Sequence, residues 1–313
     1  MNESTEQPHF IPRLWEYQKE RFPVVKHGVL IASFSFCAVC LSALLRTDIY
    51  WPNIQTSVTA FVVLFLFFLQ LRIADEFKDH ENDARFRPER PVPRGLVTLN
   101  ELKWLGILTA AIQLLLTYLL HPLLILLLAL VWGYMAFMSV EFFVPKWLKR
   151  HPFTYLWTHM LIMPLIDLFA TGSDWLQVDL YPPDGLIWFL IVSFFNGVVI
   201  EIGRKTWAPV QEREGVESYS ADWGIKRAIV VWLGAILFSF ICACVVALKI
   251  NFLIPVLITL TVFSGLLITL GIAFIRCPDA KKSGLLENGS GLWVAGLYLI
   301  LGIIPMGYNI WLN

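Results

Sequence analysis

The sequence is poor in charged residues, which make up only 15% of its 313 positions, and its formal net charge at pH 7 is zero. Hydrophobic residues make up 57%, and the mean hydropathy is +0.66. These values exclude a large soluble domain and predict a membrane protein. Without a basic excess, nucleic acid is not expected as a partner. The informative feature is therefore where the few charges lie.

Cysteine is also scarce, with five residues in the chain. The pairs Cys37/Cys40 and Cys242/Cys244 lie inside apolar runs, and neither has a second ligand pair nearby. They are predicted to be buried thiols rather than metal ligands. Residues 1–23 are polar and precede the first apolar run, so they do not resemble a cleaved signal peptide.

Apolar runs long enough to cross a bilayer are abundant, and at about 20 residues per span they predict nine transmembrane helices. The predicted spans are 27–45, 54–74, 104–120, 122–143, 153–172, 185–202, 228–248, 252–275 and 291–312. Only His121 and Pro122 separate the third from the fourth. The predicted fold is an all-α polytopic membrane protein, one domain over residues 1–313, with 1–26 as a cytoplasmic N-terminal segment.

Basic residues support this topology, because they gather on one side of the predicted membrane. Of the 24 lysines and arginines, 21 fall on the side of the N-terminus, Arg72 lies within the second span, and only Arg46 and Lys249 fall on the other side. The positive-inside rule then predicts a cytoplasmic N-terminus and an external C-terminus, in an inner or plasma membrane.

Four carboxylates, Asp75, Glu76, Asp79 and Asp83, follow the second span directly. A continuous helix would stack Asp75, Asp79 and Asp83 on one face, with Glu76 within reach of Asp79. That face repels itself unless a cation neutralises it. Mg²⁺, for which Mn²⁺ is expected to substitute, is usually held by a few carboxylates and the oxygens of a substrate phosphate. The segment therefore predicts a divalent-metal site for a phosphate-bearing substrate.

Basic side chains around this segment are expected to bind anionic oxygens that the metal leaves free. They are Lys78, Arg85, Arg87, Arg90 and Arg94.

A second polar loop, residues 196–224, begins while the chain is still in a predicted span. Glu201 and Lys205 are i, i+4 neighbours near the end of this span, where charges are costly unless they face a cavity or a partner. They are therefore site candidates, and Arg204 beside them is expected to bind substrate. After Pro209 a second charged cluster contains Glu212, Arg213, Glu214 and Glu217, which an ordinary solvated loop would also explain.

The two loops together resemble those of the UbiA superfamily of intramembrane prenyltransferases. Residues 75–83 fit its first motif, NDxxDxxxD, with Asp for Asn and Glu for Asp, and residues 90–95 fit the RPxPxG that follows. Residues 215–218 match the GxxS/T ending near its second motif, DxxxD. The chain departs from the family where Glu201 and Lys205 stand in place of aspartates, with Glu212 as the next acid.

This resemblance implies nine helices around a central cavity, with an allylic prenyl diphosphate clamped by Mg²⁺ between the loops. It implies transfer of the prenyl group to a lipophilic or aromatic acceptor in or near the membrane, with release of pyrophosphate. The implied metal ligands are Asp75, Glu76, Asp79, Asp83, Glu201 and Glu212, and the implied catalytic residues are Asp79, Asp83, Lys205 and Arg94. An apolar cavity would keep water from the allylic cation.

Aromatic and ionisable residues inside the predicted spans are candidates for the cavity wall. Tyr134 in the fourth span is expected to line it, although aromatic residues in helix bundles more often serve packing. His159 and Asp167 lie eight residues apart in the fifth span, and either is a candidate to bind or deprotonate an acceptor. For Asp167, a position at the outer end that reaches water is the competing interpretation.

Two other functions remain open. An intramembrane terpene cyclase would use the same diphosphate without an acceptor, and the altered metal motifs are compatible with it. A secondary transporter is less favoured, because its binding groups would lie near the bilayer midplane and no internal repeat is evident. A CDP-alcohol phosphotransferase is excluded, since its Asp-Gly and Ala-Arg elements are missing ahead of Asp75.

Overall fold

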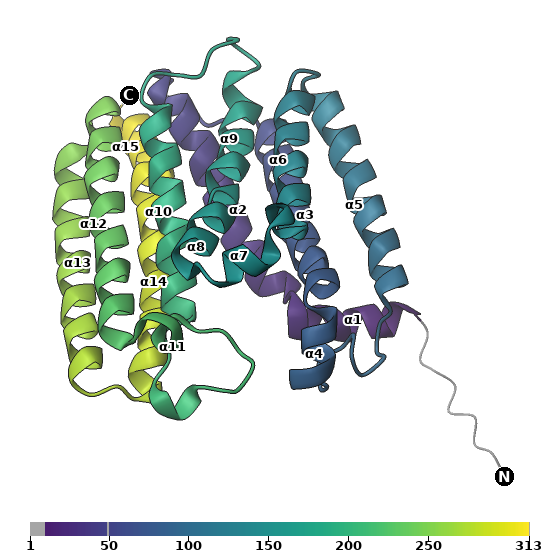
Figure 1. Cartoon of the computed structure of the whole chain (residues 1–313). Coiled ribbons are helices and arrows are strands. Elements are labelled where there is room, and N and C mark those ends of the chain that lie inside the picture. Colours follow the sequence, from purple (N-terminus) through teal and green to yellow (C-terminus); the bar gives the residue numbers. More distant parts are fainter. Residues whose placement is uncertain (1–9, 49, 313) are drawn as a thin grey trace.

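The computed structural model describes residues 10–48 and 50–312, which form helices and no strand. The long helices stand side by side in a bundle (Figure 1). In the described residues, eight helical segments are long and apolar enough to cross a membrane. They are α2 (Val24–Leu45), α3 (Ile54–Lys78), α5 (Leu99–Leu120), α8 with α9 (Pro152–Met160, Ile162–Trp175), α10 (Leu186–Arg204), α12 (Ile225–Lys249), α13 (Leu253–Arg276) and α14 with α15 (Ala280–Leu301, Ile303–Leu312).

The predicted fourth span is the exception. It corresponds to α6 (Leu124–Ser139), an apolar helix of 16 residues, which is short of a full span. The chain leaves α6 for a tight turn, η1 (Glu141–Phe143), and a short helix, α7 (Pro145–Lys149). The all-helical membrane fold is thus confirmed, whereas the count of nine spanning helices is not.

Two helices begin where the hydropathy pattern did not place them. Helix α14 starts at Ala280 instead of residue 291, because Asp279 caps it by accepting a hydrogen bond from the Lys282 backbone at 2.8 Å. The charged residues in the first turn of α14 lower the hydropathy there, so the hydropathy pattern did not reveal where the helix begins. Helix α1 (Phe10–Arg21) lies in the N-terminal segment for which no helix was predicted.

Helix α1 is fastened to the end of the bundle from which α3 and α5 extend (Figure 1). Its Tyr17 is buried in a small apolar cluster with Ile73, Val92, Val97 and Leu102. Two ion pairs flank this contact, Arg13 with Glu101 at 2.6 Å and Arg21 with Glu76 at 2.5 Å. Short helices are marginal alone in water, so these contacts are what hold α1 in place.

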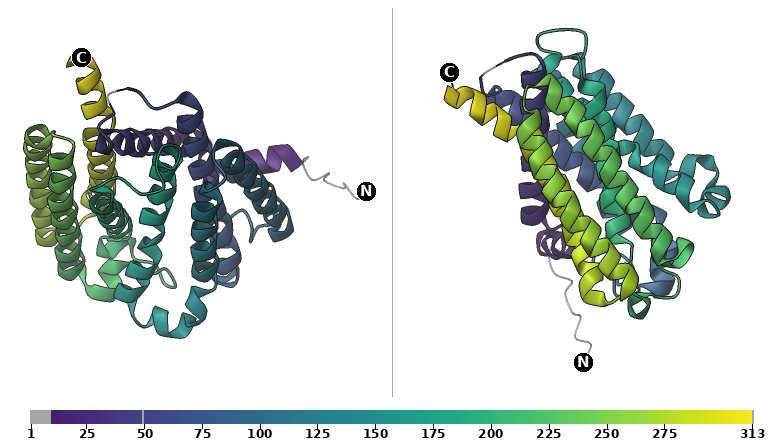
Figure 2. Two further views of the ribbon diagram at one scale, coloured as in Figure 1. Left: turned by 90° about the horizontal axis from the view of Figure 1, so that it is seen from above. Right: turned by 90° about the vertical axis from the view of Figure 1, so that its left-hand side faces the viewer.

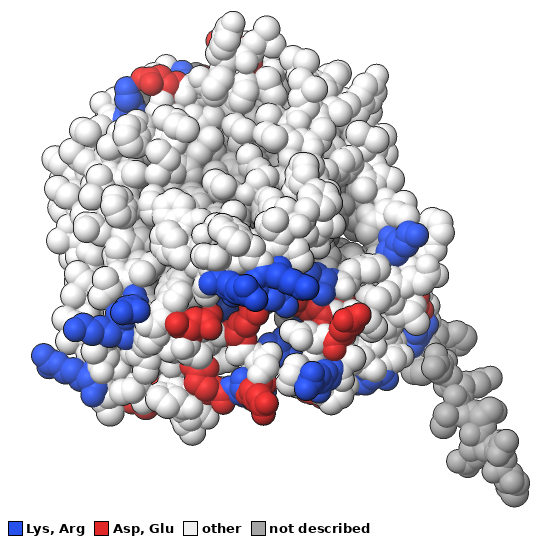
Figure 3. All heavy atoms as spheres, in the orientation of Figure 1, with Lys and Arg blue, Asp and Glu red and all other residues white. Residues whose placement is uncertain are grey.

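Charged side chains gather in a band at that same end of the molecule, where α4 (His80–Phe86), α7 and α11 (Tyr219–Trp223) lie, and the visible face above the band is almost uncharged (Figures 1 and 3). The N-terminal helix lies at this charged end, and the C-terminal helix ends at the opposite end (Figure 1). The molecule thus has an apolar body and a polar surface at one end.

The last span bends at Gly302, so that α15 leaves the axis of α14 (Figure 2). A Cβ atom on Gly302 would lie 2.4 Å from the carbonyl oxygen of Cys37 and 2.6 Å from its Cα. Only glycine therefore allows the bend to rest directly on the backbone of α2.

We expect Gly302→Ala to lower the stability of the protein by about 1–3 kcal/mol, the usual cost of overpacking, because the Cys37 backbone cannot move aside. Gly291→Ala is the matched control, since a Cβ there meets nothing within 4 Å. Thermal unfolding in detergent checks both variants. Equal melting temperatures for Gly302→Ala and the control would contradict the proposed close contact.

Candidate functional site

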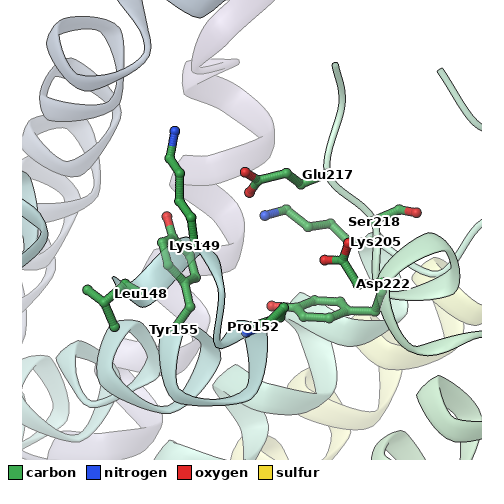
Figure 4. Close-up of a pocket in the computed structure, with 9 residues that line it drawn as sticks. Leu148, Lys149, Pro152, Tyr155, Lys205, Glu217, Ser218 and Asp222 are labelled. Carbon is green, nitrogen blue, oxygen red and sulfur yellow. The ribbon is translucent and has the colours of Figure 1, made fainter. Parts of the chain in front are cut away.

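A pocket opens at the charged end of the bundle, between α7, α8, the end of α10 and the loop that leads into α11. Its charged and aromatic lining includes Lys149, Tyr155, Lys205, Glu217 and Asp222. Lys149 and Tyr155 lie on one side and Glu217, Lys205 and Asp222 on the other (Figure 4). The lining therefore brings two ammonium groups, which can bind an anionic ligand, together with the two carboxylates of Glu217 and Asp222.

The first acid-rich segment crosses the junction between two helices. Helix α3 ends at Lys78, α4 begins at His80, and Asp79 lies between them. The helical hydrogen bonds continue nonetheless, since the Asp79 backbone donates to Asp75 at 2.9 Å and that of Asp83 donates to Asp79 at 2.8 Å. The predicted i, i+4, i+8 spacing of the three aspartates is therefore retained.

Two acids of this segment are already neutralised by arginines. Glu76 is buried and pairs with Arg21 of α1 at 2.5 Å. Asp83 is also buried, and its two oxygens pair with Arg87 at 3.2 Å and with Arg90 at 2.5 Å. Buried carboxylates are tolerated only when paired in this way, so both interactions stabilise the loop.

Asp75 and Asp79 remain available. The Asp75 side chain is 46% exposed and has one long contact with Arg72, at 3.4 Å. Asp79 has no ion pair within the described part of the chain. Burial raises the pKa of Asp79, the positive charge of Lys78 opposes this effect, and the charges of Asp75 and Asp83 add to it. A bound cation would relieve the electrostatic cost of ionising Asp79.

These residues can be tested against the expected Mg²⁺. Over residues 10–48 and 50–312, no group of three or more His, Cys, Asp or Glu side chains is arranged to hold a metal ion. Mg²⁺ does not need such a cage, because it is usually bound by one or two carboxylates together with substrate phosphates. Asp75 and Asp79 fit that requirement, and the other expected ligands are paired elsewhere. Their role as metal ligands stays a prediction.

The second loop carries its acids in a different arrangement. Glu201 lies between Arg204 at 2.6 Å and Lys205 at 2.8 Å. Glu212, on the loop that follows η2 (Pro209–Gln211), accepts hydrogen bonds from Ser218 and Ser220, each at 2.7 Å. Both carboxylates thus organise their own loop, and Lys205 is the member of this group that reaches the pocket.

Not all of the remaining basic candidates lie at the polar pocket. Arg94 pairs with Glu20 of α1 at 2.5 Å, and Arg85 lies over the Phe86 ring at 4.9 Å. Neither lines the pocket. Lys149 does line the pocket. The sequence did not predict it as a site residue, because it is one of several basic residues that follow the fourth predicted span.

A buried polar cluster lies behind Tyr155. Lys78 pairs with Glu141 at 2.9 Å and donates to the Tyr155 hydroxyl at 2.8 Å. His159 stacks on the Tyr155 ring, with centroids 3.8 Å apart, and approaches Glu141 at 3.4 Å. Tyr134 donates its hydroxyl to the backbone of Thr158 at 2.6 Å. Glu141 was missed in the sequence, where its only signal was an acid at the end of an apolar run.

The backbone at Glu141 is strained. Glu141, Phe142 and Phe143 have φ angles of +50°, +52° and +61°, the left-handed region that residues with a Cβ rarely adopt. Each such residue costs about 1–3 kcal/mol, so the surrounding contacts must hold this turn in place. The turn directs the Glu141 carboxylate into the bundle instead of toward the exterior.

Asp167, also a candidate, does not reach water as expected from its place near the outer end of its span. It is 1% exposed and accepts a hydrogen bond from Tyr298 of α14. This contact joins α9 to α14 and lies apart from the pocket lining.

A second hollow of about 290 Å³ lies between α3, α5 and α6, and is lined mainly by apolar and small residues together with Gln70 and Ser139. This hollow is shallow and open, and Ala74, which borders it, immediately precedes Asp75 in the chain.

Comparison with known proteins finds several that are similar to this chain. A digeranylgeranylglyceryl phosphate synthase from Thermococcus sibiricus (strain DSM 12597 / MM 739) is 24% identical over 273 residues, covering 82% of this chain and 88% of the relative. The apo structure of a UbiA homologue from Aeropyrum pernix K1 is 15% identical with a TM-score of 0.66, covering 87% of this chain and 97% of the other. A structure from work on a digeranylgeranylglyceryl phosphate synthase in membranes is 16% identical with a TM-score of 0.65, covering 96% and 99%.

The family assignment rests on a broader match. The model of the UbiA prenyltransferase family matches residues 33–287, which is most of the chain and includes both polar loops. The apolar helices and this match together identify an integral membrane protein with prenyltransferase activity. The chain therefore belongs to the UbiA prenyltransferase family.

Proposed function

We propose that this prenyltransferase moves a prenyl group from an allylic prenyl diphosphate to the hydroxyl of a lipid acceptor, with Mg²⁺ and at the cytoplasmic side of the membrane. The observation that carries the proposal is the juxtaposition of Lys149 and Lys205 in one polar pocket. The apolar body of the bundle supplies the surroundings that a prenyl tail requires.

The chemistry explains why cations belong in this pocket. Breaking an allylic carbon–oxygen bond leaves its electron pair on pyrophosphate, so positive groups must lie where that charge develops. We expect Lys149 and Lys205, which both line the pocket, to donate to diphosphate oxygens. Asp75 and Asp79 would hold Mg²⁺, which supplies further neutralisation of the leaving group when it is bound.

The type of acceptor is suggested by the relative from Thermococcus sibiricus, whose name specifies a digeranylgeranylglyceryl phosphate product. A product of that kind is formed when a hydroxyl of glyceryl phosphate, already carrying one geranylgeranyl group, receives a second. We therefore infer a glyceryl phosphate lipid as the acceptor. A cyclic hydrocarbon formed from prenyl diphosphate and Mg²⁺ alone would instead establish the terpene cyclase.

Metal dependence is the first test. We expect pyrophosphate release from geranylgeranyl diphosphate to require Mg²⁺ or Mn²⁺, since a bare diphosphate beside Asp75 and Asp79 would be repelled. Ca²⁺ should support less release, because its looser coordination positions the leaving oxygen less tightly. Pyrophosphate is measured with each cation and with a chelator. Undiminished release in the presence of chelator would refute the metal site.

The pocket lysine is the second test. Lys149→Gln should weaken binding of inorganic pyrophosphate roughly 10- to 100-fold, the range expected when a hydrogen bond to a charged group is lost. Lys281→Gln, which removes an exposed lysine in the first turn of α14, is the control and should bind normally. Isothermal titration calorimetry with Mg²⁺ present compares them. Equal affinities would remove Lys149 from the site.

The two aspartates Asp79 and Asp83 should behave differently. Asp79→Asn should leave the fold intact, because it relieves repulsion, yet slow turnover by about 100-fold or more. Asp83→Asn should lower the free energy of unfolding by about 3–5 kcal/mol, since it leaves Arg87 and Arg90 without their buried counter-ion. Thermal unfolding and pyrophosphate release, measured on both proteins, separate the roles. A stable, fully active Asp79→Asn protein would contradict this assignment.

A further inference from the structure

Glu141 and His159 present two facing atoms that make no hydrogen bond. The distance from Glu141 Oε2 to His159 Nε2 is 3.4 Å, and neither atom has a hydrogen-bond partner in the described part of the chain. Both residues are 7% exposed. Buried polar atoms are normally satisfied, so an unpartnered pair needs an explanation.

The tautomer of His159 follows from its other nitrogen. His159 Nδ1 lies 2.9 Å from the backbone oxygen of Tyr155, and a carbonyl oxygen can only accept, so Nδ1 carries the hydrogen. The neutral ring then presents a lone pair at Nε2 to another lone pair at Glu141 Oε2. One proton placed between the two atoms would form a hydrogen bond with both.

The other carboxylate oxygen is fully engaged. Lys78 lies 2.9 Å from Glu141 Oε1, and the Tyr155 hydroxyl lies 3.5 Å from the same oxygen. Lys78 already balances the charge of the carboxylate, so Oε2 is better suited to accept a proton than to bind a second cation. Because Tyr155 also lines the polar pocket, this site is one side chain away from the place proposed for the diphosphate.

The backbone supports a functional origin for this arrangement. Three consecutive residues, Glu141 to Phe143, adopt the left-handed region, and this costly turn is what aims the carboxylate inward. The Phe142 ring packs edge-on against the His159 ring, with centroids 6.1 Å apart, which fixes the imidazole opposite Oε2. A glutamate needed only as a counter-ion for Lys78 would not require this fixed imidazole.

We infer that Glu141 and His159 together accept the proton of the acceptor hydroxyl, an assignment that rests on the proposed function. The acceptor O–H bond breaks and its proton goes to Glu141 Oε2, where His159 Nε2 shares it. The acceptor oxygen forms a bond to the allylic carbon, and the bond from that carbon to diphosphate breaks with its electron pair leaving on pyrophosphate. A positioned base of this kind contributes to the transfer step and not to diphosphate binding.

The test separates binding from transfer in Glu141→Gln. Pyrophosphate affinity with Mg²⁺ should stay within about twofold of wild type, whereas adduct formation from geranylgeranyl diphosphate and geranylgeranylglyceryl phosphate should fall by at least about 100-fold. Glu287→Gln, which alters an exposed glutamate on α14, should match wild type in both measurements.

A second variant keeps the inference testable if Glu141→Gln does not fold. His159→Gln leaves the ion pair of Lys78 with Glu141 in place and should show the same loss of adduct formation with normal pyrophosphate affinity. Transfer retained in a folded Glu141→Gln protein would overturn the inference, and so would a parallel loss of pyrophosphate binding, which would make Glu141 a support for Lys78. Wild-type protein that forms no adduct would instead overturn the proposed acceptor, and the inference with it.

Discussion

The structure depends on the constraint that a charge in an apolar bundle must have a partner. Glu76, Asp83 and Glu201 each pair with one or two cations near the charged end of the bundle. The pair of Glu76 with Arg21 joins α3 to α1, whereas the pairs of Asp83 and Glu201 are local to α4 with the loop after it and to the end of α10. Among the six acids expected to bind the metal, Glu76, Asp83, Glu201 and Glu212 have close partners in the described part of the chain, so Asp75 and Asp79 are the candidates left to bind a cation supplied from outside.

The two polar loops differ in how their charged side chains are paired. The first loop has Asp75 and Asp79 in excess of its paired charges, and burial raises the pKa of Asp79. In the second loop Glu201 meets two cations, Arg204 and Lys205, although the loop as a whole has more acids than bases. A divalent metal held by Asp75 and Asp79 would neutralise part of the charge of a diphosphate, and lysines would donate to its oxygens, as the proposed function requires. Of the two positions where the second motif has aspartates, Glu201 keeps an acid and Lys205 has a cation in its place.

The strained turn after α6 connects membrane packing to this chemistry. Helix α6 stops at Ser139, and the left-handed residues that follow bring Glu141 beside Lys78 and His159. Lys78 in turn is adjacent to Asp79 in the chain. The short helix is therefore part of how the site is built, because a longer α6 would carry Glu141 onward along the helix axis.

The sequence alone determined the all-helical membrane fold, the charged end of the bundle and the spacing of Asp75, Asp79 and Asp83, because hydropathy and helical periodicity are local properties. It also located both polar loops. Only the tertiary structure decided which charges pair: Arg94 with Glu20, Glu76 with Arg21, and Lys78 with Glu141. The partners of these pairs are 55 to 74 residues apart in the sequence. Which cation pairs with which acid depends on how the helices pack, and a local sequence pattern does not encode that packing.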